Sequence, residues 1–326
     1  MHQLSQGPYP PTDVHDAALL TPPHTIQQHA TDYRSLNLNI IHEYPSTEGQ
    51  SPGANILIAT PLMDGAAYLE KYFQKLTEIN YPKELISLAF LVSTVAKDES
   101  IDSTLVTLNE HVSKLVSHSH YRRITVIQQK AAPSAYSHHQ RHQYKLQESR
   151  RKELARCRNA LLATALLDES WVLWLDVDIV EYSPDLLQML MHLNVDIVVP
   201  NCLRSGSSLW RTEGVPYDRN NWIETTESLA TQRDLEDDEV LFEGYERDHP
   251  TYRQSMADLD RKHQVLVVLD GVGGTFTLIK AQVHRAGINF PTLPIDHQIE
   301  TEGLAKWAKR EGFGVYGAPF LIIQHS

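Results

Sequence analysis

Cysteine, basic charge and long apolar runs are all scarce in this sequence, and each shortage excludes a class of protein. Two cysteines, Cys157 and Cys202, are too few for a disulfide framework or a thiolate zinc site, and whether they pair is left open. The net charge of −12 argues against a protein that coats nucleic acid or an anionic membrane. The longest apolar runs have five residues, as in Trp171–Leu175, whereas a bilayer span needs roughly 20. We therefore expect no nucleic-acid partner and no membrane span within this chain.

The composition and the apolar pattern of the sequence change near residue 54. Residues 1–53 are rich in Pro, His, Gln, Thr and Ser, with neither the basic region nor the apolar region of a signal peptide. We expect them to form a loosely packed extension. Residues 54–326 carry the regular apolar patterns, and we expect them to form one folded domain.

Strand and helix patterns alternate at the start of this domain. Short apolar runs at 56–59, 88–92 and 124–127 are typical of buried strands. Apolar residues at helical spacing lie between them, at 66–76 and 105–115. This β-α-β-α-β order predicts a parallel sheet covered by helices. Further along the chain, the patterns predict helices at 154–165 and 302–310 and strands at 171–175, 265–269, 275–279 and 320–323.

Two carboxylates follow the most apolar predicted strand. Trp171–Leu175 runs directly into Asp176 and Asp178. Ligands of open α/β sheets bind just outside the carboxyl ends of the strands, and paired carboxylates there suit Mg²⁺ or Mn²⁺ carrying a diphosphate. An aspartate pair that merely caps a turn is the alternative. His325 also follows an apolar strand, so it is a candidate third metal ligand, with a structural histidine as the alternative.

The segment 138–158 is the one strongly basic stretch. Arg151 and Arg158 are seven residues apart on a predicted helix, so they share a face. They form either a solvated surface or one side of a phosphate site. The acidic run at 234–248 is interpreted as a solvated loop.

Three further segments carry residues that suit a sugar. Glycines at 271, 273 and 274 allow either a tight turn or a close backbone approach to a donor sugar. The segment 217–222 combines Asp218 with asparagine and tryptophan, which suit the polar edge and apolar face of a sugar ring. The segment 294–303 is dense in hydrogen-bonding side chains, although the acids could instead complement a helix N-terminus.

Taken in order, eight segments resemble one known family. They are ILIATPL, YPKELISLAFLVS, ARCRNALL, WVLWLDVDIV, PYDRNNWIE, DGVGGTFTLIKAQVHRAGINFP, DHQIETEG and IIQHS. Together they resemble the fungal mannan polymerase subunits, glycosyltransferase family sixty-two, over residues 55–326. That family comprises Golgi α-mannosyltransferases that use GDP-mannose to extend the outer chains of N-glycans.

The resemblance implies a fold and a set of site residues. The implied fold is of the GT-A type, a single nucleotide-binding α/β domain with a central mixed, mostly parallel sheet. Asp176 and Asp178 would hold Mn²⁺ (or Mg²⁺) on the GDP diphosphate, with His325 completing the metal shell. Asp218 would orient the donor sugar or stabilise positive charge developing on it. The remaining residues implied in nucleotide or sugar binding are Arg151, Arg158, Asn159, Gly273, Gly274, Asp296, His297 and Glu300.

The function expected from the resemblance is retaining α-mannosyl transfer from GDP-mannose to a mannose-containing glycan. An α-1,6 linkage is expected, while the residues alone leave α-1,6 and α-1,2 both open. The chain would work with other mannosyltransferase subunits in the Golgi lumen. A non-catalytic scaffolding subunit is the main alternative. A nucleotidyltransferase is a weaker one, because its glycine-rich, lysine-containing loop is missing after residues 56–59.

Overall fold

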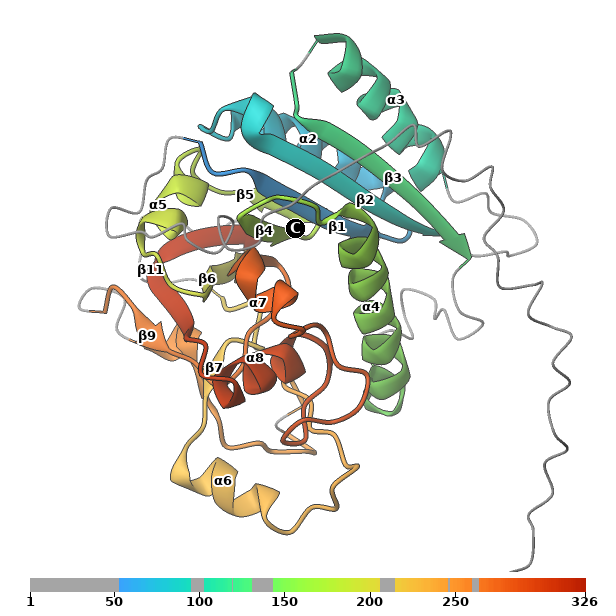
Figure 1. The fold of residues 1–326 in the computed structure, drawn as a ribbon. Coiled ribbons are helices and arrows are strands. Elements are labelled where there is room, and N and C mark those ends of the chain that lie inside the picture. Colours follow the sequence, from blue (N-terminus) through green and yellow to red (C-terminus); the bar gives the residue numbers. More distant parts are fainter. Residues whose placement is uncertain are drawn as a thin grey trace, which may run out of the picture. The chain divides into compact units, whose positions relative to one another are not determined.

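The computed structural model describes residues 53–94, 103–118, 120–130, 143–205, 215–245, 247–259 and 264–326 (Figure 1). Its helices are α2 (Ala66–Glu78), α3 (Thr104–His118), α4 (Tyr144–Ala165), α5 (Leu186–His192), α6 (Thr226–Gln232), α7 (Ala281–Arg285) and α8 (Glu300–Arg310), with 3₁₀ turns η3 (Lys83–Leu85) and η4 (Met256–Asp258). Its strands are β1 (Ile56–Leu62), β2 (Ile86–Thr94), β3 (Arg123–Lys130), β4 (Trp171–Leu175), β5 (Ile179–Glu181), β6 (Ile197–Arg204), β7 (Trp222–Ile223), β8 (Gln254–Ser255), β9 (Val267–Val268), β10 (Phe276–Lys280) and β11 (Val315–His325).

The described residues form one nine-stranded sheet and a small β7–β8 ribbon. The order in the large sheet is β3-β2-β1-β4-β10-β6-β11-β5, and β9 also pairs with β11. Neighbours from β3 to β4 are parallel, and β10 is antiparallel to both β4 and β6, so β6 has the same direction as β4. Strand β11 is parallel to β6, whereas β5 and β9 are antiparallel to β11. The sheet is therefore mixed but mostly parallel.

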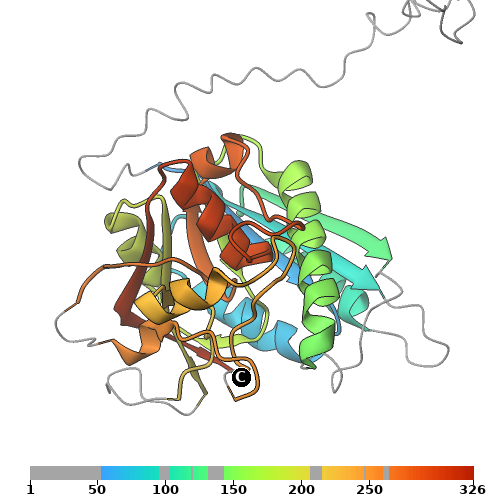
Figure 2. The ribbon, with the colours of Figure 1, turned by 90° about the horizontal axis from the view of Figure 1, so that it is seen from below.

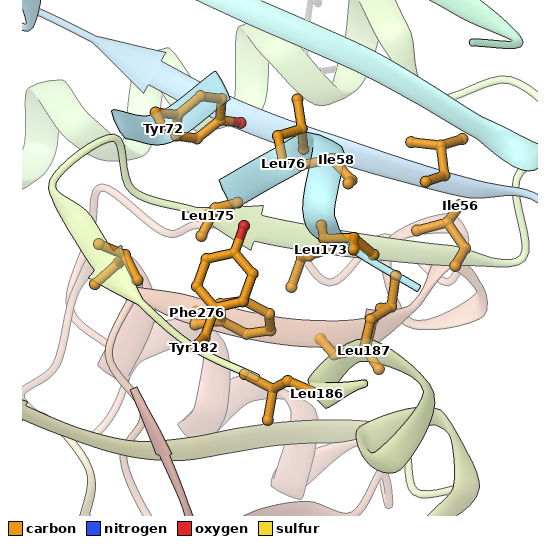
Figure 3. Packing of buried hydrophobic residues seen from close by; sticks show 14 of the residues in the cluster. Ile56, Ile58, Tyr72, Leu76, Leu173, Leu175, Tyr182, Leu186, Leu187 and Phe276 are labelled. Carbon is orange, nitrogen blue, oxygen red and sulfur yellow. The ribbon is translucent and has the colours of Figure 1, made fainter. Parts of the chain in front are cut away.

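Helices cover both faces of the sheet, which explains why β4 is buried along its whole length. Alternate side chains of β1 enter different cores, because successive strand residues point to opposite faces. Ile56 and Ile58 pack with the side of the sheet that α2, α3 and α5 cover (Figure 3). Leu57 and Ala59 pack on the side covered by α4, α7 and α8. Figure 2 shows α4 and α8 beside one another on that second side.

The predicted α/β class and the mixed, mostly parallel central sheet are confirmed. The strand predicted at 171–175 has those bounds, and the strand predicted at 320–323 lies within the longer β11, which ends at His325. The prediction of a strand over 265–269 is wrong in extent: only Val267–Val268 pairs, and Val265 and Val268 are exposed. The central strand β6 and the short β5 were not predicted.

Some residues of the expected N-terminal extension and of the basic stretch lie outside the described residues. Residues 1–52 of the expected extension and residues 138–142 of the basic stretch lie outside them. Cys157 and Cys202 are both buried free thiols. In the part of the chain that the structure describes, no helix has the length and apolar character of a membrane span.

Candidate functional site

Asp176 and Asp178 lie at the carboxyl end of β4, as predicted. The backbone N–H of Asp176 donates to the Thr275 carbonyl at 3.0 Å, which ties the turn to the segment before β10. The carbonyl of Asp178 accepts from the N–H of Ser326 at 3.0 Å, next to the end of β11. The backbone around both aspartates is thus held by two other parts of the sheet.

His325 meets this aspartate pair. Its Nε2 lies 2.9 Å from Oδ2 of Asp178, and its ring stacks on Tyr217 with centroids 3.5 Å apart. Burial lowers the pKa of His325, but the hydrogen bond and charge of Asp178 outweigh burial and raise that pKa above its usual value. We call Asp176, Asp178 and His325 the strand-end site. The side chain of His325 is 8% exposed, so a mobile chain end does not describe it.

Arg158 links the strand-end site to helix α8. Its Nη2 lies 3.5 Å from Oδ1 of Asp176, and its Nη1 is paired with Glu300. Burial raises the pKa of Asp176; Arg158 opposes this, while the charges of Asp178 and Glu300 add to it, and the pKa reaches about 7. The charge of His325 also lowers the pKa of Asp176, but burial and the two neighbouring carboxylates outweigh both positive groups, so an added cation would favour the ionised form of Asp176.

A second buried ion pair lies beside the first. Arg151, two helical turns before Arg158, is paired with Glu302 through Nη1, and its Nη2 donates a hydrogen bond to Oδ1 of Asn220 at 3.2 Å. Both arginines are buried, because each faces a carboxylate of α8. The solvated-surface interpretation of the basic helix is therefore wrong for these two residues.

The glycines allow close approach of charged side chains. A Cβ atom on Gly273 would lie 1.8 Å from Oδ2 of Asp218, and one on Gly274 would lie 2.4 Å from Nη2 of Arg158. Asp218 accepts hydrogen bonds from the backbone N–H of Asn220 at 3.0 Å and from Thr275 Oγ1 at 2.9 Å. Burial raises the pKa of Asp218, although these hydrogen bonds lower it in part. Asp218 is thus packed against the glycine segment that adjoins the strand-end site.

Three predicted site residues contact other parts of the molecule. The Asn159 amide is engaged with the backbone of Phe290, donating at 2.8 Å and accepting at 3.0 Å. Asp296 is ion-paired with Arg310, and Nδ1 of His297 lies 3.1 Å from the Glu239 carbonyl. Within the described residues, none of these contacts joins Asn159, Asp296 or His297 to Asp176, Asp178 or His325.

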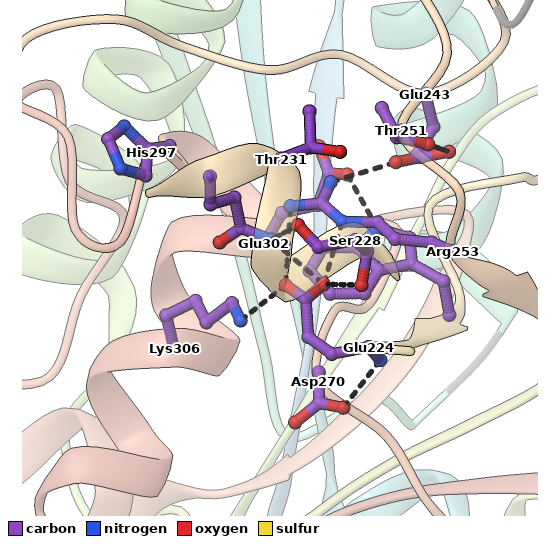
Figure 4. A network of polar contacts seen from close by, with 12 residues as sticks. Glu224, Ser228, Thr231, Glu243, Thr251, Arg253, Asp270, His297, Glu302 and Lys306 are labelled. Atoms are coloured by element: carbon purple, nitrogen blue, oxygen red, sulfur yellow. Dashed lines mark hydrogen bonds and ion pairs between the residues drawn. The ribbon is translucent and has the colours of Figure 1, made fainter. Parts of the chain in front are cut away.

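Trp222 does not present a free ring to a sugar, so that part of the interpretation of segment 217–222 is wrong. The residue is fully buried, with the Arg253 guanidinium 3.6 Å and the Lys306 ammonium 5.1 Å from its ring centroid. Arg253 and Lys306 both pair with Glu224 (Figure 4). The solvated-loop interpretation of 234–248 also fails at Glu243, which is buried against Arg253.

Two site residues were not singled out from the sequence. Glu302 was only one acid within a dense segment, yet its carboxylate joins Arg151 to the indole N–H of Trp222, which donates at 2.8 Å. No sequence pattern indicates a role for Tyr217. Its place in the site follows only from the structure, in which β11 brings the ring of His325 against it. Among the described residues, no group of three or more His, Cys, Asp or Glu side chains is already arranged to hold a metal ion.

The fold is of the predicted GT-A type: a mixed, mostly parallel sheet between helices carries an acidic pair at the carboxyl end of β4. The chain belongs to the Anp1 family, whose model matches residues 33–294. The chain is 40% identical to the mannan polymerase complex subunit mnn9 of Schizosaccharomyces pombe over 290 residues, 86% of this chain and 83% of that protein. It is 36% identical to the mannan polymerase complex subunit MNN9 of Candida albicans over 278 residues, 83% and 74% of the two chains. The predicted relationship to mannan polymerase subunits is therefore confirmed.

Solved structures are more distant. The mannosyltransferase PcManGT from Pyrobaculum calidifontis, in complex with GDP-Man and Mn²⁺, is 13% identical with a TM-score of 0.48, over 88% of this chain and 61% of that one. GalNAc-T7 with UDP, GalNAc and Mn²⁺ is 11% identical with a TM-score of 0.48, over 83% and 44%. Likenesses at this level carry no argument about chemistry, which rests on the family and on the site.

Proposed function

We propose that this chain is a GDP-mannose-dependent, retaining α-mannosyltransferase that extends mannan, the outer chains of N-glycans. The observation that carries the proposal is the meeting of Asp176, Asp178 and His325 at the carboxyl end of β4, where α/β sheets bind ligands. The names of the relatives, which are subunits of mannan polymerase complexes, support mannan as the polymer that is extended. An α-1,6 linkage is the product we propose.

The strand-end site has the donor set for a divalent cation. Carboxylate oxygens and a neutral imidazole suit Mn²⁺, and carboxylates suit Mg²⁺. Burial is the main cause of the raised pKa of Asp176, and the charges of Asp178 and Glu300 add to it; a cation bound here would favour the ionised carboxylates. Asp176, Asp178 and His325 would hold it. When bound, the cation would neutralise charge on the diphosphate and on GDP as it leaves.

The neighbouring charged residues would bind and orient the donor. Arg158 already contacts Asp176, so a diphosphate at the strand-end site would lie within reach of its guanidinium. Arg151, on the same face of α4, would add a second cation, and both would then be shared with Glu302 and Glu300. Asp218 would orient the donor sugar or stabilise positive charge on it. Gly273 and Gly274, which carry no Cβ, let Asp218 and Arg158 pack against this segment, and the donor sugar would lie beside it.

The remaining expectations belong to the proposal as well. Asn159, Asp296 and His297 stay predicted binding residues, although their present partners lie outside the strand-end site. The relatives are named as subunits of complexes, so we propose that this chain assembles with other mannosyltransferase subunits. The Golgi lumen is the proposed compartment.

Calorimetric titration of GDP, with and without Mn²⁺, tests the proposal. We expect GDP to bind with Mn²⁺ and to lose most of its affinity without it. The variant Asp178→Asn should lose the metal-dependent part, because an amide oxygen is a weaker ligand for a hard cation. Asp237→Asn, at an exposed position in the acidic loop, is the matched control and should bind as wild type. Binding of GDP that ignores both Mn²⁺ and Asp178 would contradict the metal assignment. Binding without sugar transfer would favour a scaffolding subunit.

A further inference from the structure

A small, partly open cavity lies on the segment that also supports the strand-end site. Its volume is about 180 Å³, and its wall includes Pro216, Arg219, Glu243, Arg253, Ser255 and Asp258, with Trp222 behind them. We call it the Arg219 cavity. The proposed function uses none of these six residues.

The course of the chain places this cavity next to the strand-end site. Along four consecutive residues, Tyr217 stacks on His325 and Asp218 packs against Gly273, while Pro216 and Arg219 line the cavity. The indole of Trp222, which is part of the wall, donates to Glu302, the partner of Arg151. The Arg219 cavity and the strand-end site are therefore adjacent and share residues 216–219 as a structural segment.

The lining of the Arg219 cavity is charged but balanced. Arg219 and Arg253 carry two positive charges, and Glu243 and Asp258 carry two negative ones. Guanidinium groups donate hydrogen bonds, carboxylates accept them, and the Ser255 hydroxyl does both. A phosphate or a nucleotide would meet as much repulsion as attraction there, whereas a neutral polyhydroxyl compound can use donors and acceptors alike.

The inner part of the cavity is rigid. Nη1 of Arg253 lies 2.8 Å from Oε1 of Glu243, and Thr251 Oγ1 donates to Oε2 of Glu243 at 3.0 Å (Figure 4). The Arg253 guanidinium also stacks on the Trp222 ring at 3.6 Å. Because these side chains already have fixed positions, a ligand would pay little ordering entropy on binding. Arg219 and Asp258 are exposed and lie at the mouth.

The volume sets the size of the ligand. It corresponds to about six water molecules at the roughly 30 Å³ that each occupies in the liquid. Drug-sized ligands occupy larger pockets, from about 300 Å³ upward. The Arg219 cavity therefore has room for one sugar unit rather than for an oligosaccharide.

From this adjacency, charge balance and size, we infer that the Arg219 cavity binds one neutral sugar unit of the glycan acceptor. The identity of that sugar as mannose rests on the proposed function; the presence of a sugar subsite does not. The subsite would hold the acceptor beside Asp218 while the donor occupies the strand-end site.

A ligand-observed NMR titration that measures the binding of α-1,6-mannobiose to the full chain tests this inference. We expect millimolar binding to wild type and at least a fivefold loss of affinity in both Arg219→Ala and Asp258→Asn. These two residues are exposed, so the variants should keep the fold, which thermal melting will verify. Asp237→Asn is the control for charge loss alone and should bind mannobiose as wild type.

Two results would overturn the subsite: equal binding of mannobiose by wild type and both cavity variants, or no binding by wild type. A parallel GDP titration with Mn²⁺ separates this inference from the proposed function. GDP affinity should be the same in wild type and the cavity variants. If GDP fails to bind wild type while mannobiose binding depends on Arg219 and Asp258, the donor assignment fails and the sugar subsite stands.

Discussion

At the scale of single residues, the site depends on Gly273, because the Asp218 carboxylate packs closer to this backbone than any side chain at position 273 would permit. We predict that Gly273→Ala displaces the Asp218 carboxylate, because the new Cβ would lie 1.8 Å from Oδ2. Overpacking of this kind costs about 1–3 kcal/mol in the free energy of unfolding. Urea unfolding measures the loss. Gly65→Ala is the control, since its Cβ would meet Val177 at an ordinary 3.4 Å; equal stability of both variants would argue against the tight packing.

The Arg151–Glu302 pair gives a second prediction at this scale. Glu302→Ala leaves the buried Arg151 without its carboxylate partner, and breaking a buried pair on one side costs about 3–5 kcal/mol. We expect the double variant Arg151→Met, Glu302→Ala to recover part of that stability, because no buried charge is then left unpaired. Glu311→Ala, at an exposed position after α8, should change the free energy of unfolding little. A loss in Glu302→Ala no larger than that of Glu311→Ala would contradict the account.

Sequence could predict some site residues and not others. The sequence indicates Asp176, Asp178 and His325 because each lies within three residues of the end of an apolar run, and strand ends define where ligands bind. The partners of Arg151 and Trp222 could not be found in this way. They depend on how α8 packs against α4, roughly 150 residues earlier in the chain, and no local pattern encodes that contact.

At the scale of elements, Glu224 joins α8 to the segments around α6. It is paired with Lys306 of α8 at 2.7 Å and with Arg253 at 3.4 Å, and it accepts a hydrogen bond from Ser228 of α6 at 2.6 Å (Figure 4). Burial alone would raise the pKa of Glu224, but Arg253 and Lys306 outweigh it and lower the pKa to about 2. The carboxylate is thus a charged link between these elements.

This shift predicts a loss of stability in acid. The unfolded-state pKa is 4.5 and the folded-state pKa is about 2, so Glu224 stabilises the fold fully above pH 4.5. That contribution, about 3 kcal/mol, is lost as the pH falls from 4.5 toward 2. Urea unfolding at pH 6 and pH 3 should show a smaller difference for Glu224→Gln than for wild type. Glu227→Gln, exposed in α6, is the control; the same pH dependence in wild type and Glu224→Gln would refute the shift.

The elements themselves were predictable where the apolar pattern is regular. Strand β4 and the helices α2, α3, α4 and α8 follow from period and composition. Strand β6 does not, because Pro200 and Asn201 interrupt its apolar run. Proline is rare inside central strands, yet Pro200 pairs here with Ala318 of β11. The neighbouring strands, rather than the local sequence, determine that β6 forms.

At the scale of the whole molecule, the strand-end site draws on the ends of β4 and β11, so ligand binding should stabilise the fold as a unit. We predict that Mn²⁺ and GDP together raise the melting temperature by several degrees, because a ligand at 100 times its Kd adds about 2.7 kcal/mol. Differential scanning calorimetry measures the shift. It should vanish in Asp178→Asn and persist in Asp237→Asn. A full shift in Asp178→Asn would place the ligand elsewhere.

Transfer of mannose from GDP-mannose to α-1,6-mannobiose tests the central claim most directly. The full chain, with its partner subunits if they are needed, is incubated with Mn²⁺, and the linkage in the trisaccharide product is read by NMR. The account predicts an α-linked product from wild type and a rate lower by roughly 100-fold or more in Asp178→Asn, since a metal supplies several kcal/mol of stabilisation to the departing diphosphate. No GDP release and no product with any divalent metal, or undiminished transfer by Asp178→Asn, would contradict it.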